Sequence, residues 1–108
     1  MNESADKAIQ FIWDNAPKYA KAKQELAELE AFKSSLKAIE MKKHPNLSVT
    51  AQEREAYASA EYVQLCEGIG QATYEVELLK WRLLTAQMKF DAWRSEQANN
   101  RIMDKNLK

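Results

Sequence analysis

The feature that most constrains this chain is a run of ten apolar or aromatic residues spaced alternately by three and four positions. The run comprises Tyr62, Leu65, Ile69, Ala72, Val76, Leu79, Leu83, Ala86, Phe90 and Trp93. This spacing places every member on one face of an α-helix, and over several heptads it is typical of coiled-coil packing. No proline interrupts residues 60–103, so the sequence predicts one long helix there.

A second amphipathic helix is predicted over residues 17–43, to pack against the long helix. Its apolar positions are Tyr19, Ala22, Leu26, Leu29, Phe32, Leu36 and Ile39. The step from Leu29 to Phe32 is one residue too short for strict 3–4 alternation. We therefore expect a stammer, a point of local overwinding, at this step.

Breaker and capping residues set the other expected boundaries. Pro17 predicts that a separate N-terminal helix occupies residues 1–16, because the proline ring clashes with the preceding turn. A turn is expected over residues 44–49, and Thr50 with Glu53 forms a capping box that predicts a short helix over 50–58. Residues 104–108 are expected to form a frayed tail.

These elements define the expected fold class. Two glycines and two prolines in 108 residues argue against a many-stranded β fold, which needs a breaker at each turn. We expect a single all-α domain over residues 1–108. It is a long helical hairpin with coiled-coil packing, completed by short N-terminal and connecting helices.

A second apolar stripe runs beside the first on the long helix. It comprises Tyr74, Leu78, Trp81, Thr85, Met88 and Ala92. One antiparallel neighbour covers one stripe, so the second requires another partner. We predict self-association through Tyr74, Leu78, Trp81 and Met88, with a homodimer favoured and an oligomeric helical bundle as the result.

Residues capable of catalysis or metal binding are few. With one His and one Cys, the chain cannot form an internal disulfide or a Cys/His zinc site. His44 is interpreted as a polar turn residue and Cys66 as a small buried apolar residue. Glu75 and Glu77 point to different sides of a helix, which excludes a paired acid and base.

Gly68 and Gly70 lack the rest of a phosphate-binding loop, so we interpret them as permitting close helix approach or a local bend. The sequence therefore predicts a protein that is not an enzyme and has no catalytic residues, cofactor or metal.

Charge is balanced overall, with 16 basic and 16 acidic residues, but it is unevenly distributed. Residues 80–108 carry seven basic residues and three acidic ones. Arg82, Arg94 and Arg101 are the candidate contacts for single-stranded DNA, through phosphate binding beside aromatic side chains. Because the aromatics already belong to the two stripes, we expect any such binding to be weak.

Several strings resemble those of a family of small phage and prophage proteins. They are residues 51–58 (AQEREAYA), 79–87 (LKWRLLTAQ), 92–101 (AWRSEQANNR) and 13–20 (WDNAPKYA). The family is largely uncharacterised, and its genes tend to lie near phage recombination and replication genes. The resemblance implies a phage-encoded accessory protein in the cytoplasm of the bacterial host.

The expected function is therefore protein–protein contact in phage DNA recombination or replication, with phage recombination or host DNA-processing proteins as partners. One alternative is inhibition of a host defence or host DNA-processing complex, and another is a structural or assembly role in the virion. We expect no membrane association, because the sequence has no apolar run of about 18 residues and no signal peptide pattern.

Overall fold

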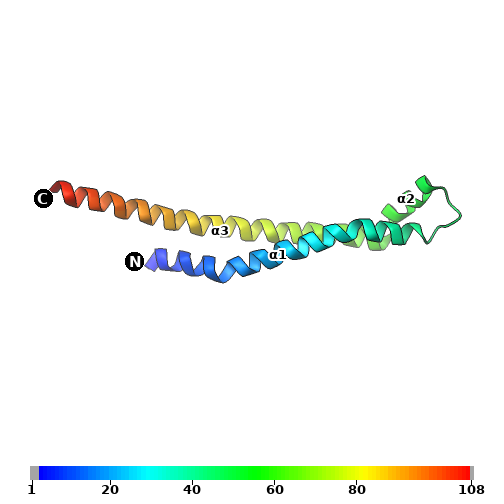
Figure 1. The fold of residues 1–108 in the computed structure, drawn as a ribbon, viewed down its shortest axis with the longest axis horizontal. Coiled ribbons are helices and arrows are strands. Elements are labelled where there is room, and N and C mark those ends of the chain that lie inside the picture. Colours follow the sequence, from blue (N-terminus) through cyan, green and yellow to red (C-terminus); the bar gives the residue numbers. More distant parts are fainter. Residues whose placement is uncertain (1–2, 108) are drawn as a thin grey trace. The chain divides into compact units, whose positions relative to one another are not determined.

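The computed structural model describes residues 3–107 and contains three helices (Figure 1). They are α1 (Glu3–Met41), α2 (Val49–Ala58) and α3 (Ala60–Leu107). No strand occurs within residues 3–107. The protein is an all-α helical hairpin in which α2 is a short connecting helix, as the sequence predicted.

The chain divides into two compact units, and each contains part of α1 and part of α3. The first unit combines α1 up to Ala20 with α3 from Glu77 onward. The second unit, Lys21–Val76, holds the rest of both long helices together with α2 and the turn that precedes it.

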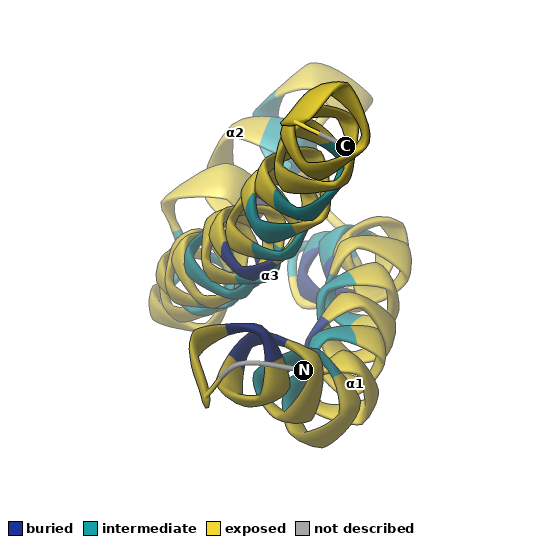
Figure 2. Cartoon of the chain, turned by 90° about the vertical axis from the view of Figure 1, so that its left-hand side faces the viewer, coloured by how far each residue is buried: buried dark blue, intermediate teal, exposed yellow. Residues whose placement is uncertain are grey.

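The predicted seam of α3 is confirmed. All ten residues from Tyr62 to Trp93 are buried or half-buried, with Val76 and Ala86 the most deeply buried. Figure 2 shows buried and half-buried positions along α3, whose remaining surface is mostly exposed. The helix continues to Leu107, so residues 104–107 are helical rather than frayed. Lys108 lies outside the described residues.

The predicted division of α1 at Pro17 is wrong. Residues Glu3–Met41 form one helix with Pro17 inside it, and the helix ends two residues before the expected boundary at 43. Pro17 has no N–H to donate to the carbonyl of Trp13, at a cost of about 3 kcal/mol in a helix interior. Packing continues on both sides of it, since Asn15 and Tyr19 are half-buried. On α1 the boundary between the two units lies after Ala20, three residues beyond Pro17.

The predicted stammer in α1 is also wrong. Phe32 and Ile39 are 46% and 49% exposed, whereas Leu36 and Glu40 are buried. The positions that continue the 3–4 spacing are Ala5, Ala8, Ile12, Asn15, Tyr19, Ala22, Leu26, Leu29, Lys33, Leu36 and Glu40. All of these except Lys33 are buried or half-buried. The spacing is therefore regular along the whole helix.

The cap of α2 differs from the predicted one. The side chain of Ser48 accepts a hydrogen bond from the backbone N–H of Ala51 (3.2 Å), and the helix starts at Val49. Thr50 lies inside the first turn, and Glu53 pairs with Lys37 of α1 instead of closing a capping box. Ser48 adopts an extended conformation suited to an N-cap, so backbone geometry decided between the two candidates.

A single residue, Ser59, separates α2 from α3. Its hydroxyl donates to the carbonyl of Ala56 (2.8 Å) and accepts from the N–H of Tyr62 (3.2 Å). The same side chain therefore ends one helix and begins the next, which accounts for the absence of a longer loop.

The buried core is made mainly of small side chains. Among the described residues, the buried apolar ones are Ala5, Ala8, Ala22, Leu36, Ala56, Val76 and Ala86. No large side chain in this part of the chain is fully buried. Gly68 and Gly70 do not mark a close helix approach, because a Cβ added to either would meet nothing within 4 Å. Of the two alternatives, close helix approach was wrong, and a local bend stays a prediction.

Candidate functional site

The residues considered for catalysis are not gathered into a site. The backbone carbonyl of His44 accepts from the Gln52 side chain (3.0 Å) and from the N–H of Leu47 (3.2 Å), so the residue belongs to the turn. Cys66 is exposed, which corrects its assignment as a buried apolar residue. Within residues 3–107, no group of three or more His, Cys, Asp and Glu side chains is placed to hold a metal ion.

Polar contacts concentrate in the second unit, where they join its elements. Lys37 of α1 pairs with Glu53 of α2 (3.5 Å) and lies 4.9 Å from the ring centre of Tyr57. A hydrogen bond to Tyr57 and the Glu53 carboxylate raise the pKa of the Lys37 ammonium above its ordinary value. Tyr57 in turn makes an edge-on ring contact with Tyr62 of α3.

A second polar contact lies at the end of α1. Glu40 is buried, and its carboxylate accepts from the Lys43 ammonium at 2.9 Å. This hydrogen bond, together with the charges of Glu40 and Glu61, raises the pKa of Lys43. Both contacts hold the turn and α2 in place, which is a structural role.

The first unit presents an extensive exposed apolar surface. Trp13 of α1 is 77% exposed, and Trp81 and Met88 of α3 are 61% and 68% exposed. A groove of about 800 Å³ borders Trp13 and is lined by Ile9, Ile12, Trp13, Ala16, Pro17, Ala20, Gln87 and Phe90. A smaller groove shares Ile12, Ala16 and Gln87 with it and reaches Leu84. Ile9, Trp13, Ala16 and Leu84, which line these grooves, are called the apolar face below. Trp81 and Met88 line neither groove, and their spacing places them on the side of α3 opposite the seam.

The predicted self-association residues have different environments. Trp81 and Met88 are exposed in the first unit, whereas Leu78 is half-buried. Tyr74 is 69% exposed and lies in the second unit. Sequence reasoning placed the second stripe on α3 alone and missed the contribution of α1.

That contribution had a signal in the sequence. Ile9, Trp13, Ala16 and Ala20 are spaced by four, three and four residues, which places them on one side of a helix. Treating Pro17 as the end of a helix split this line and left Trp13 in a separate element.

A different side of the first unit carries a groove with basic residues. It has a volume of about 460 Å³ and is lined by Ser4, Lys7, Ala8, Phe11, Arg82, Thr85, Ala86 and Lys89. Lys7 already pairs with Glu3 of the same helix (2.9 Å). Ser4, Lys7 and Phe11 are spaced by three and four, so they lie on another side of α1 from Ile9 and Trp13.

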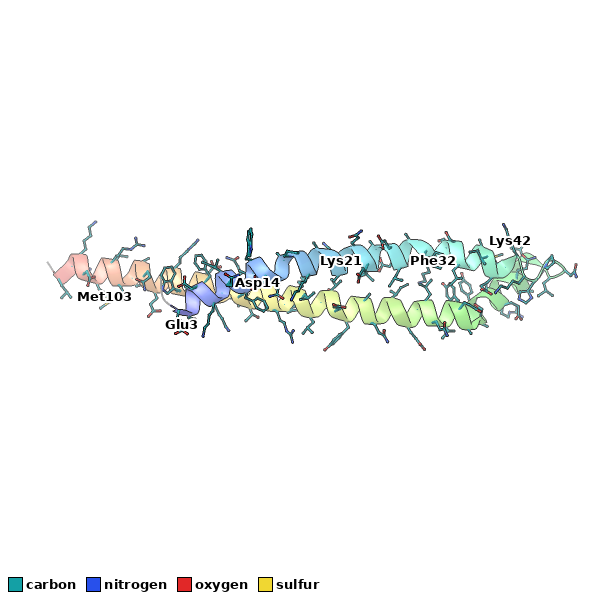
Figure 3. The ribbon with its side chains drawn as sticks, turned by 90° about the horizontal axis from the view of Figure 1, so that it is seen from below. Glu3, Asp14, Lys21, Phe32, Lys42 and Met103 are labelled. Atoms are coloured by element: carbon teal, nitrogen blue, oxygen red, sulfur yellow. The ribbon has the colours of Figure 1, made fainter. Side chains whose placement is uncertain are left out.

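The three predicted DNA contacts are not brought together. Arg82 lines the basic groove, while the Arg94 guanidinium lies 5.8 Å from the ring centre of Phe90. Arg101 is exposed on the last part of α3. In Figure 3 this part of the helix, marked by Met103, continues past Glu3 at the start of α1. The arginines therefore do not form one binding surface.

Comparisons with protein-family models, curated proteins and solved structures yield no match for this chain. None of the helices formed by residues 3–107 combines the length and the apolar character needed to cross a membrane.

Proposed function

We propose that this protein is a non-enzymatic, phage-encoded accessory protein that acts through protein–protein contacts in phage DNA recombination or replication. The exposure of Trp13 and Trp81, two large aromatic side chains of the first unit, is the observation that carries the proposal. Large aromatic side chains are enriched at protein interfaces.

The last part of α3 adds to the surface available for contact. Ile102, Met103 and Leu107 are all exposed on this segment, which also carries Arg101 and Lys105. Apolar side chains interspersed with charges are typical of the core and rim of a protein interface.

The biological setting rests on the resemblance of residues 13–20, 51–58, 79–87 and 92–101 to the phage and prophage family. A protein in that setting acts in the cytoplasm of the bacterial host, on phage recombination or replication proteins or on host DNA-processing proteins.

Affinity purification from infected cells, followed by mass spectrometry, tests the proposal. The bait carries either the natural sequence or the paired substitutions Trp13→Ala and Trp81→Ala. The matched control removes two exposed apolar side chains of the second unit, by Phe32→Ala and Ile39→Ala. We expect recombination or replication proteins with the natural bait and the control, and their loss with the tryptophan variant.

Other outcomes separate the alternatives. Recovery of a host defence complex would favour an inhibitor, and recovery of virion proteins would favour an assembly role. The same proteins bound equally by the tryptophan variant would contradict a role for Trp13 and Trp81.

A further inference from the structure

We infer that the basic groove of the first unit binds an acidic amphipathic helix of another protein, as a third helix laid along α1 and α3. This site goes beyond the proposed function, because neither Trp13 nor Trp81 lines the basic groove. Three observations carry the inference. They are unpaired cations on the walls of the groove, small buried side chains at its floor, and a third helix that already packs on α1 and α3 in the second unit.

The walls of the basic groove carry positive charge that the protein does not neutralise. Arg82 and Lys89 of α3 are exposed, and neither forms an ion pair with any residue between 3 and 107. Lys7 lines the groove from α1, where it pairs with Glu3 of its own helix. Complementary charge steers association and selects partners, so two free cations in one groove favour an occupant with anionic groups.

The floor of the groove is hollow because small side chains lie there. Ala8 and Ala86 both line the groove and are 5% and 6% exposed. Phe11, which is half-buried, adds an apolar wall. The groove volume of about 460 Å³ is enough for a few side chains of a partner. The matching occupant therefore has an apolar side chain as well as its anionic groups.

The spacing of the cations fits a helix with carboxylates two turns apart. Arg82 and Lys89 are seven residues apart on α3, which is about 10 Å along a helix. Thr85 and Ala86 lie between them on the same side of α3. A helix that runs beside α3 presents its residues i and i+7 at the same separation and its residues i+3 and i+4 to the hollow. The occupant thus has acidic residues at i and i+7 and an apolar residue between them.

The second unit contains a third helix held in this way. There α2 contacts α1 through the pair of Glu53 with Lys37 (3.5 Å), and it contacts α3 through the rings of Tyr57 and Tyr62. Ala56, three residues after Glu53, is 0% exposed. An acidic residue paired with a lysine of α1, followed by a buried apolar residue, therefore holds α2 in place. The first unit has no third helix among the described residues.

A second copy of the chain and a single-stranded nucleic acid both match the groove less well. None of the 16 acidic residues of this chain lies seven positions from another, so no helix of a second copy supplies the required pair. A single strand binds along a track of cations, with its bases stacked on aromatic rings. Phe11 is the one aromatic side chain among the described residues that line the groove, and it is half-buried. Arg94 and Arg101 do not line the groove.

Fluorescence anisotropy with the full chain tests the inference. The probe is a labelled, alanine-based helical peptide of about 16 residues, with two glutamates seven positions apart and a leucine between them. The control peptide has glutamine in place of both glutamates. We expect the glutamate peptide to bind with a Kd of about 10–100 µM at low salt, and the glutamine peptide to bind about 10-fold more weakly. A labelled single-stranded oligonucleotide should also bind more weakly than the glutamate peptide.

Charge reversal on the protein gives the sharpest comparison. Arg82→Glu with Lys89→Glu should weaken binding of the glutamate peptide by about 10-fold or more, and should create binding of a peptide with lysines at the same two positions. Both residues are exposed, so the helices should keep their fold, which circular dichroism verifies. The matched control, Lys18→Glu with Lys105→Glu, reverses two exposed charges of the same unit outside the groove. It should bind the glutamate peptide as the natural protein does.

Four outcomes would overturn the inference. They are no binding of the glutamate peptide at about 1 mM protein, equal binding of the glutamate and glutamine peptides, an equal loss in the two double variants, and no gain of the lysine peptide on charge reversal. Tighter binding of the oligonucleotide than of the glutamate peptide would overturn it as well, and would assign the groove to nucleic acid instead.

Discussion

The two units share the same 3–4 spacing along α1 and α3 but differ in what surrounds it. In the second unit, α2 adds a third element, and Lys37 joins α1 to Glu53 and Tyr57 of α2. In the first unit, Lys7 pairs with Glu3 of its own helix, and Gln87 with Asp91 of its own helix. The second unit therefore has polar contacts that join separate elements, whereas those of the first lie within single helices. Both units leave large apolar side chains exposed, but the two exposed tryptophans, Trp13 and Trp81, belong to the first. Interaction with other molecules is therefore expected from the first unit.

Leu36→Ala should have the largest effect on the second unit. Leu36 is 8% exposed, so its truncation should lower the free energy of unfolding by about 2–4 kcal/mol. Phe32→Ala removes a larger side chain at an exposed position and should cost less than about 1 kcal/mol. Chemical denaturation of both variants measures the difference. A greater loss of stability for Phe32→Ala than for Leu36→Ala would support the stammer that the sequence predicted.

Gly68→Ala and Gly70→Ala should change stability in the opposite direction. Both glycines lie inside α3 with open space where a Cβ would be. Alanine is favoured over glycine in a helix interior, so each change should stabilise by about 0.5–1 kcal/mol. Thermal unfolding followed by circular dichroism gives the result. A destabilised variant would mean that another helix approaches this face of the second unit.

Ser48→Ala tests the start of α2. Loss of the hydroxyl that accepts from the Ala51 N–H should cost about 1 kcal/mol. Thr50→Ala, made at the residue that the sequence motif favoured, is the control and should change stability by less than about 0.5 kcal/mol. Hydrogen exchange at the first turn of α2 distinguishes the two caps, and faster exchange with Thr50→Ala alone would contradict the assignment.

Alkaline pH should affect the contacts made by Lys37 and Lys43. Because the folded state raises both pKa values above 10.5, the stabilisation from these charges is complete below that pH. It is lost as the pH rises further and the ammonium groups lose their protons. Unfolding measured between neutral pH and pH values above 10.5 should show a smaller alkaline decline in Lys37→Gln than in the control Lys33→Gln. Identical declines would show that the Lys37 contact adds nothing.

Neutralising Arg82, Arg94 and Arg101 together should have the smallest effect. The three side chains occupy separate places, so we expect no binding of a labelled single strand at tens of micromolar natural protein. Fluorescence anisotropy at low salt measures it. Binding that weakens steeply with salt and is lost in the triple variant would contradict this expectation and make the basic groove a nucleic-acid site.

Local periodicity explains which parts of the fold were predictable. The seam of α3 follows from residue spacing alone, since its residues from Tyr62 to Trp93 alternate by three and four without a break and outnumber those of the second stripe. The predicted seam of α1 included the apolar Phe32 and Ile39. Regular 3–4 spacing instead places the charged Lys33 and Glu40 at these seam positions. Only packing shows that Glu40 can be buried there, with its carboxylate bonded to Lys43.

The apolar face could be predicted only in part, for a related reason. The exposed Trp81 and Met88 were identified from one helix, but the grooves beside Trp13 and Leu84 form through the pairing of two distant segments. The sequence correctly indicates that Pro17 destabilises a helix interior. That the helix continues through Pro17 depends on packing at Asn15 and Tyr19, which no local pattern reveals.

The joint at Ser59 has a consequence for how the second unit could change its length and direction. Two backbone dihedral angles, with φ −67° and ψ 147°, redirect the chain between α2 and α3. A helical conformation at this one residue would fuse Val49–Ala58 with Ala60–Leu107 into a single uninterrupted rod. The Ser59 hydroxyl bonds to both helix ends at this corner, so a mutation or modification of that group would act on both at once.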